Sequence, residues 1–188
     1  MKISESELDL HPIKIVRDIL EAKYPPYTQL VFSKYKYVPK SLIDTRQYYY
    51  PVISELYQFL LKQLDSLQEG EDLAFHSRIT ISDSHLLMLD MKYNTYDRLF
   101  LEEVMREFKI QNSYIYKTGR SFHVYFDKVE QDLIKFLGTI LVLDKTEDQV
   151  DQRWIGHRLL TKSLTLRWSC CNPHYSQYPE LVEVISLG

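Results

Sequence analysis

The chain has 188 residues, with 26 acidic and 23 basic side chains and a formal net charge of −3. Apolar residues make up 45% of it and charged residues 26%, which is typical of a globular protein and argues against disorder. No apolar run approaches the roughly 18 residues of a membrane-spanning helix, and the N-terminus has no basic start and apolar core of a secretory signal. We therefore expect a single cytoplasmic domain over residues 1–188 that makes no membrane contact.

The predicted elements begin with a helix that starts at Pro12 and ends before Pro25. An extended segment rich in aromatic and β-branched residues follows at 29–38, and Pro51 starts a second helix. The predicted apolar face of this second helix consists of Ile53, Leu56, Tyr57, Leu60 and Leu64. Gly70 ends a small N-terminal α/β part that covers residues 1–70.

The middle of the chain alternates between strands and helices. Two strands, at 73–81 and 85–93, are predicted around a short turn, and Asn94 is predicted to cap the helix that follows. Strands at 113–117 and 122–126 flank a Thr-Gly-Arg-Ser turn and are predicted to form a hairpin. The next helix has four inward-facing positions, at Leu133, Phe136, Leu137 and Ile140. This order of strand, helix, strand, strand, helix is that of an RNA-recognition-like (split βαβ) sheet.

A helix at 152–160 and strands at 164–169 and 181–186 complete the predicted elements. The expected fold class is α+β, with a mixed sheet in an RNA-recognition-like core over residues 71–188, packed against the N-terminal part. Near the end of the chain, Cys170 and Cys171 are adjacent. Because a disulfide between neighbours is strained, we expect two free thiols in a reducing compartment. Together with His174 they form a poor zinc set, so no zinc is expected.

Asp90 lies near the end of an apolar strand. Because side chains alternate along a strand, Asp90 and Lys92 share one face while Leu89 and Met91 point into a core. A carboxylate in this position is costly unless it is solvated, paired or bound to a cation. Two explanations stay open, an ion pair between Asp90 and Lys92 and a metal-binding carboxylate on an open sheet face.

His123 lies on the second strand of the predicted hairpin, on the face opposite the apolar residues of that strand. This position next to the turn would let it bind a phosphate together with Arg120 and Ser121. A purely structural hydrogen bond is the alternative for a single histidine on a strand.

Arg167 also lies on a strand, on the face that carries Thr165 and Ser169. An arginine in this setting suits a triphosphate or a backbone phosphate, and a surface ion pair is the alternative. The segment 151–178 contains four basic residues and one acid, although the whole chain is acidic. We therefore expect any polynucleotide to be held locally by this segment, with marked sensitivity to salt.

An acid at the end of an apolar strand, a Ser-x-His on a hairpin and a later acid before a Leu-Arg strand resemble the archaeo-eukaryotic primase superfamily, which includes the primase-polymerases. The resemblance spans about residues 86–179. It implies that Asp90 and Asp151 are catalytic and ligate Mg²⁺ or Mn²⁺. It implies further that Ser121 and His123 contact the phosphates of the incoming nucleotide, His123 as part of the catalytic set. Arg167 matches the arginine that, in this superfamily, commonly follows the later acid on a strand.

The resemblance implies a primase-polymerase-like nucleotidyltransferase that joins nucleoside triphosphates on a DNA or RNA template. One position departs from the family pattern, because Lys92 stands where the family has a second carboxylate. Two-metal chemistry needs enough negative charge to hold both cations, although Lys92 could itself neutralise a phosphate. A catalytically degenerate relative that binds nucleotide or nucleic acid beside other protein subunits therefore stays open. A purely structural interaction module would instead leave Asp90, His123 and Asp151 far apart.

Overall fold

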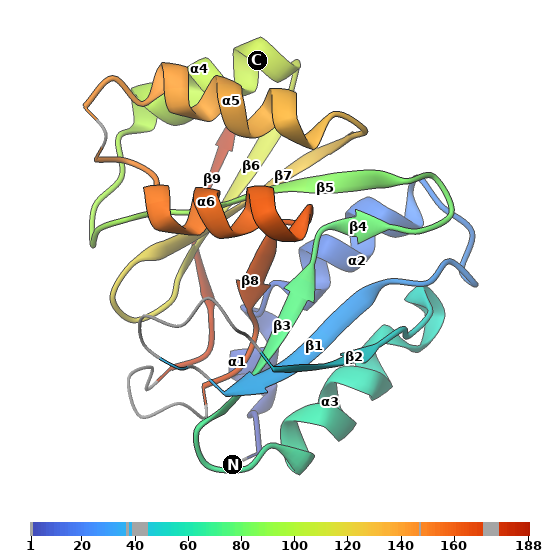
Figure 1. The fold of residues 1–188 in the computed structure, drawn as a ribbon. Coiled ribbons are helices and arrows are strands. Elements are labelled where there is room, and N and C mark those ends of the chain that lie inside the picture. The colour runs from blue at the N-terminus through green and yellow to red at the C-terminus, as the bar shows by residue number, and fades with distance from the viewer. Residues whose placement is uncertain (1, 37, 39–44, 147, 171–176) are drawn as a thin grey trace.

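The computed structural model describes residues 2–36, 38, 45–146, 148–170 and 177–188 (Figure 1). Within these residues the strands form two sheets, and every strand pair is antiparallel. The protein is therefore α+β, as predicted, but the predicted mixed sheet is wrong. None of the helices in the described ranges is long and apolar enough to span a membrane. The predictions for Cys171 and His174 fall outside the described residues.

The first sheet has the strand order β2-β1-β3-β8 in the part of the chain that the structure describes. Its strands are β1 (Val31–Lys36), β2 (Arg46–Tyr49), β3 (Glu71–His76) and β8 (Thr165–Arg167). A 3₁₀ turn (η1, Ile53–Glu55) and the helix α3 (Leu56–Ser66) follow β2. Phe59 of α3 packs on Phe32 of β1, with 5.0 Å between ring centroids, so α3 covers one face of this sheet.

The predicted apolar face of the second helix is correct at Ile53, Leu56, Leu60 and Leu64, which are all buried. It is wrong at Tyr57, which is 39% exposed. The helical segment begins as a 3₁₀ turn, so the angular position of each later residue differs from that of a uniform α-helix. The sequence prediction also missed β2.

Two helices precede the first sheet. The helix α1 (Glu5–Asp9) begins at a capping box formed by Ser4 and Glu7. The helix α2 (Ile13–Glu21) starts directly after Pro12, as predicted. Its buried residues recur at helical spacing and are Ile13, Val16, Ile19 and Leu20.

The second sheet has the order β4-β5-β7-β6-β9 among the described residues. Its strands are β4 (Arg78–Ile79), β5 (Ser84–Asp90), β6 (Asn112–Lys117), β7 (Phe122–Glu130) and β9 (Glu180–Ser186). The helices α4 (Arg98–Phe108) and α5 (Leu133–Leu143) lie together over this sheet (Figure 1). Phe136 of α5 contacts Phe126 of β7 and Phe108 of α4 through their rings. The predicted hairpin and the four inward-facing residues of α5 are confirmed.

The order β5, α4, β6, β7, α5 along the chain is the predicted one. Because β7 lies between β5 and β6, each of these strands has only antiparallel neighbours, which explains why the expected mixed sheet does not form.

The predicted strand at 73–81 is divided between the two sheets, because β3 pairs with β1 whereas β4 pairs with β5. The chain changes sheets at Ser77, which is fully buried. The Ser77 N–H donates to the Leu164 carbonyl at 2.8 Å, and the Ser77 carbonyl accepts from the Leu86 N–H at 2.9 Å. These distant partners, rather than the local pattern, determine where the strand breaks.

The helix α4 is capped by Asp97 and not by Asn94, because the Asp97 carboxylate accepts from the Leu99 N–H at 2.9 Å. Between Asp90 and Asp97 the chain forms the isolated bridge at Met91 and then a bend before the helix begins. The Tyr96 ring packs edge-on against Phe122, with centroids 5.0 Å apart. This contact holds the residue before the cap against β7.

Trp168 joins the two sheets in the core. Its ring stacks on Phe75 of the first sheet at 4.9 Å between centroids. Its indole N–H donates to the Tyr125 hydroxyl of the second sheet at 2.8 Å, and its carbonyl accepts from His11 Nε2 at 2.9 Å. The hydrophobic core is therefore continuous between the sheets.

Candidate functional site

A cleft of about 300 Å³ is lined by residues of both sheets and of the helix α6 (Gln152–Thr161). Five of the residues singled out in the sequence line it, namely Asp90, Ser121, His123, Asp151 and Arg167. Arg120 and Lys92 are not among its lining residues. The residues predicted to act together therefore converge on one place, which a purely structural module does not predict.

The backbone places Asp90 and Asp151 opposite each other. Segment 149–151 pairs antiparallel with the end of β5 through the bridge between Met91 and Val150. The Asp151 N–H donates to the Asp90 carbonyl at 3.2 Å. Directly opposite residues of an antiparallel pair project to the same face, so both carboxylates face the cleft. Met91 and Val150 project to the other face and are buried.

Asp90 has a strongly perturbed acidity. Burial and then the charge of Asp151 raise the pKa of Asp90 from 3.8 to about 7, while Arg167 and Arg158 partly oppose the rise. A carboxyl group whose pKa is raised by a second, facing carboxylate is an arrangement that a bound cation relieves by neutralising the negative charge.

The donor set is small. Among the described residues, no group of three or more His, Cys, Asp or Glu side chains is arranged to hold a metal ion. Mg²⁺ is commonly bound by one or two carboxylates that share it with water and substrate phosphates. Asp90 and Asp151 therefore fit a cation whose remaining ligands come from a phosphate-bearing substrate.

Asp151 also has a structural role, as the N-cap of α6. Its Oδ1 accepts from the Arg153 N–H at 2.9 Å and from the Trp154 N–H at 3.3 Å. Because both cap bonds use one oxygen, Oδ2 remains for other partners. An asparagine here would keep the cap and lose the charge, which allows the two roles to be separated by experiment.

His123 lies beside Asp90, because the two residues are paired in the register of β5 and β7. Its Nε2 is 3.7 Å from Asp90 Oδ1. Burial, followed by the charge of Arg167, lowers the pKa of His123 well below its usual range, so the ring is neutral. Its Nδ1 is buried and has no hydrogen-bond partner in the described part of the chain. A buried polar atom without a partner is rare and points to a ligand that would supply one.

Ser121 closes the turn between β6 and β7. The Thr118 N–H donates to the Ser121 carbonyl at 3.0 Å, and Gly119 takes a φ of +100°, which favours glycine. Thr118 and Ser121 both line the cleft, whereas Arg120 is exposed on the outside of the turn.

Arg167 is buried rather than on the surface. Its Nη2 donates to the Thr118 carbonyl at 2.9 Å, and its Nη1 donates to the Ser169 carbonyl. It therefore connects β8 to the turn that carries Ser121 and brings a positive charge to the cleft.

Three arginines that line the cleft, Arg46, Arg153 and Arg158, were not predicted individually as site residues, although Arg153 and Arg158 lie in the basic segment 151–178. Arg158 lies on the buried face of α6, one helical turn after Trp154, and this spacing was a signal that could have placed it there. Arg46 lies on β2, with its guanidinium 4.1 Å from the Tyr35 ring centroid. It could not be placed because β2 itself was not predicted.

A comparison with protein-family models matches residues 54–180 to the AEP-like family, described as archaeo-eukaryotic primase 1D-like. The match covers about two thirds of the chain. The chain belongs to this primase family. Searches of curated proteins and of solved structures found no significant match. All five of the cleft residues predicted from the sequence lie within the matched segment.

Lys92 stands where the resemblance to primases called for a second carboxylate. Its Nζ lies 3.3 Å from Asp148 Oδ1 and 4.9 Å from the Tyr93 ring centroid. Its backbone N–H donates to the Gln149 carbonyl at 2.9 Å. Lys92 thus contacts the segment that carries Asp151.

Asp144 fixes the same segment from its other end. This buried carboxylate, at the C-terminal end of α5, accepts from the backbone N–H groups of Asp148, Gln149 and Val150 at 3.2, 3.0 and 3.0 Å. Three bonds to one carboxylate hold the turn that leads into Asp151. The relative placement of the cleft carboxylates therefore depends on Asp144 as well as on β5.

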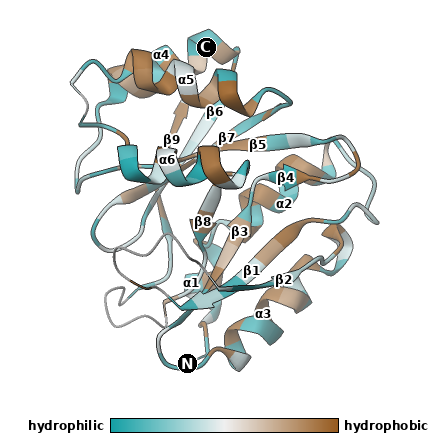
Figure 2. Cartoon of the chain, in the orientation of Figure 1, coloured by the Kyte–Doolittle hydropathy of each residue, from teal (hydrophilic) through white to brown (hydrophobic). Residues whose placement is uncertain are grey.

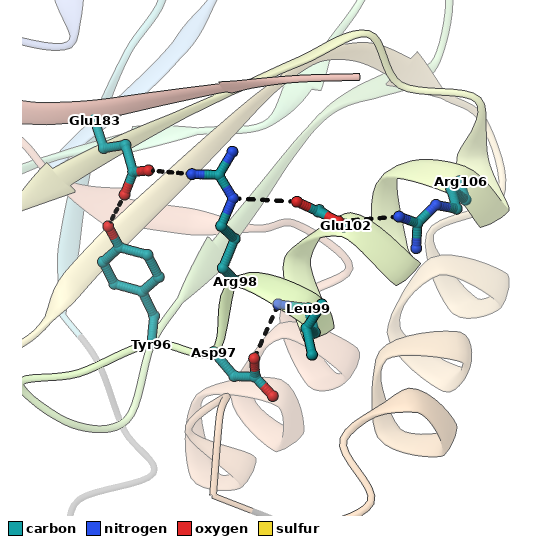
Figure 3. A network of polar contacts seen from close by, with 7 residues as sticks. All are labelled: Tyr96, Asp97, Arg98, Leu99, Glu102, Arg106 and Glu183. Atoms are coloured by element: carbon teal, nitrogen blue, oxygen red, sulfur yellow. Dashed lines mark hydrogen bonds and ion pairs between the residues drawn. The ribbon is translucent and has the colours of Figure 1, made fainter. Parts of the chain in front are cut away.

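The segment that leaves Asp90 is fixed by a polar network (Figure 3). The Tyr96 hydroxyl donates to Glu183 of β9, and Arg98 Nη1 donates to the other oxygen of Glu183 at 2.9 Å. Glu102 accepts from Arg98 at 3.1 Å and from Arg106 at 2.9 Å. The network ties the start of α4 to the edge strand of the second sheet.

Proposed function

We propose that this member of the primase family is a primase-polymerase-like nucleotidyltransferase that joins nucleotides on a nucleic-acid template. The observation that carries the proposal is the convergence of Asp90, His123 and Asp151 on one cleft. These residues come from β5, β7 and the N-cap of α6. Because these elements are far apart in the sequence, local structure alone does not bring the three side chains together.

Asp90 and Asp151 would hold Mg²⁺ or Mn²⁺ in this proposal. When bound, the cation would supply the charge that neutralises a triphosphate and stabilises transfer to a 3′-hydroxyl. For both carboxylates to be ionised, Asp90 must lose the proton that its raised pKa of about 7 otherwise keeps near neutral pH. The Asp90 carboxyl is therefore the group whose ionisation decides whether the pair can act.

The remaining cleft residues would bind the triphosphate. Nδ1 of His123 is the buried atom that lacks a partner, and the Ser121 hydroxyl lies on the same cleft. Arg158 and Arg167 add positive charge, and Arg120 would reach the nucleotide from the exposed side of the turn.

We also propose that β5, α4, β6, β7 and α5 form the RNA-recognition-like core of the protein. Their order along the chain supports this, and so does the adjacency of β5, β7 and β6 in the sheet.

A second candidate function is binding of nucleotide or nucleic acid without turnover, as part of a larger complex. It is favoured by the cleft donor set, in which Asp90 and Asp151 face each other and Lys92 stands at the position of the expected second carboxylate. Asp72 also lines the cleft, but its carboxylate accepts from the Ser169 hydroxyl at 2.8 Å. Fewer carboxylates hold fewer cations, and two-metal transfer depends on both.

The deciding experiment is incorporation of labelled nucleotides on a primed template, with Mg²⁺ or Mn²⁺, by the wild type and by Asp151→Asn. Asparagine keeps the cap of α6 and removes the charge, so we expect incorporation to fall by about 100-fold or more without a loss of folding. Asp97→Asn is the matched control, because Asp97 caps α4 in the same way and does not line the cleft.

A folded wild type that binds nucleotide but does not incorporate it, and loses the binding in Asp151→Asn, would establish the second function. A wild type that neither incorporates nor binds nucleotide would overturn both.

A further inference from the structure

A second cavity of about 500 Å³ shares no lining residue with the cleft. It lies between the start of α5 and the end of α6, where Leu133, Ile134 and Leu159 form apolar walls. The hydropathy colouring shows hydrophobic segments on both helices (Figure 2). Its volume is in the range of natural small-molecule sites, which are largely apolar with a few placed polar groups.

His85, at the start of β5, is the buried polar group of this cavity and is 7% exposed. Its Nδ1 lies 2.9 Å from the Ser77 hydroxyl, which also accepts from the Leu164 N–H at 2.9 Å. Ser77 is fully buried, and Nδ1 is the acceptor available to its hydroxyl proton among the described residues. The hydroxyl therefore donates to Nδ1, and the ring proton sits on Nε2.

Burial lowers the pKa of His85, so the ring is neutral and Nε2–H is a donor. Within the described residues no hydrogen-bond partner of Nε2 is found. The His85 side chain lines the cavity, so a bound ligand could supply that partner. A donor on a largely buried side chain that lines an apolar cavity is suited to an oxygen acceptor on a ligand.

The charges at the cavity set the rest of the ligand chemistry. The Asp132 carboxylate caps α5 by accepting from the Lys135 N–H at 2.8 Å. Lys162, the C-cap of α6, takes a left-handed φ of 54° and also lines the cavity. The cavity lining therefore includes one acidic and one basic residue beside its apolar residues.

We propose that this cavity binds a small molecule that has an apolar body and one oxygen acceptor, a carbonyl or a carboxylate, which accepts from His85 Nε2. The proposal is independent of the function proposed for the cleft. The two sites are linked by shared elements, because β5 carries His85 near one end and Asp90 at the other, and α6 lies between its N-cap Asp151 and its C-cap Lys162.

Benzoate and benzamide are suitable probes, because they share an apolar ring and differ in whether the acceptor is charged. The purified chain is titrated with each probe while the ¹⁵N signals of the His85 ring are followed by NMR. We expect a shift of the Nε2 signal and dissociation constants of about 1 mM, as is usual for molecules of this size. Lys162→Gln distinguishes a carboxylate acceptor from a carbonyl acceptor. If the cavity prefers a carboxylate, this variant should weaken the binding of benzoate and leave that of benzamide unchanged.

Leu159→Gln and Leu160→Gln form a matched pair of variants. Leu159 lines the cavity and is 41% exposed, so glutamine is tolerated there, whereas its neighbour Leu160 is 73% exposed and does not line the cavity. We expect Leu159→Gln to weaken binding at least about fivefold and Leu160→Gln to leave it unchanged. Equal affinity in Leu159→Gln, or no shift of the His85 signals with either probe, would overturn the proposal.

Discussion

Asp151 donates its backbone N–H to the backbone carbonyl of Asp90 at 3.2 Å, and this bond sets the two residues opposite each other at the cleft. The contact belongs to the main chain, so it does not depend on the charge of either side chain. A carboxylate of the pair can therefore be neutralised while its backbone position is retained. This separation of position from charge underlies the predictions that follow.

Asp90→Asn is expected to stabilise the protein most at high pH. Because the pKa of Asp90 is raised from 3.8 to about 7 in the folded chain, the folded state keeps a proton that the unfolded state loses. The destabilisation by Asp90 is thus absent below about pH 4, grows towards about pH 7 and is complete above it. Urea unfolding at several pH values should show the advantage of asparagine rising by up to about 1.4 kcal/mol per pH unit in this window.

The advantage should level off above about pH 7 and shrink when a divalent cation is added. A stability difference that does not change with pH would mean that neither burial nor the charge of Asp151 raises the pKa of Asp90 in the folded protein.

Asp144→Ala should loosen the turn that carries Asp151. The substitution leaves three backbone N–H groups without their acceptor, so we expect the free energy of unfolding to fall by about 1–3 kcal/mol. If Asp151 moves away, the pKa of Asp90 should also fall, which ¹³C NMR of the Asp90 carboxyl measures. Asp144→Asn keeps one acceptor oxygen, so its free energy of unfolding should lie between those of the wild type and Asp144→Ala. An unchanged pKa of Asp90 in a destabilised Asp144→Ala would show that pairing with β5 alone places Asp151.

Lys92→Met tests whether the ammonium group of Lys92, at the position that differs from the family pattern, contacts the nucleotide. Lys92 pairs with Asp148 and does not line the cleft, so we expect nucleotide affinity to change less than about twofold. The loss of this partly exposed ion pair should cost less than about 1 kcal/mol in unfolding free energy. A tenfold loss of affinity in equilibrium binding would show instead that Lys92 neutralises a phosphate.

Tyr96→Phe tests the network that holds the segment after Asp90. Burial and the bond to Glu183 raise the pKa of Tyr96 to about 12, so its hydroxyl remains a donor at any working pH. Removing that hydroxyl should cost about 1 kcal/mol in urea unfolding. Arg106→Ala is the control at the exposed end of the same network and should have almost no effect. Equal costs for the two variants would contradict a specific role for Tyr96.

Local patterns in the sequence predicted α2, the four inward positions of α5 and the hairpin of β6 and β7. The same patterns placed Asp90 near a strand end and His123 beside a turn. These predictions succeed because helical and strand periodicities are properties of neighbouring residues. The primase resemblance likewise rested on the order of residues along the chain, and the family match confirms it.

Only the tertiary structure decided how distant segments pair. The break at Ser77 depends on Leu164 and Leu86, and the facing of Asp90 and Asp151 depends on a bridge to segment 149–151. Lys92 shared a predicted face with Asp90, yet its ammonium group lies at Asp148. Such contacts are fixed by the packing of the whole molecule, because the local sequence does not specify which distant backbone groups and charges will be near.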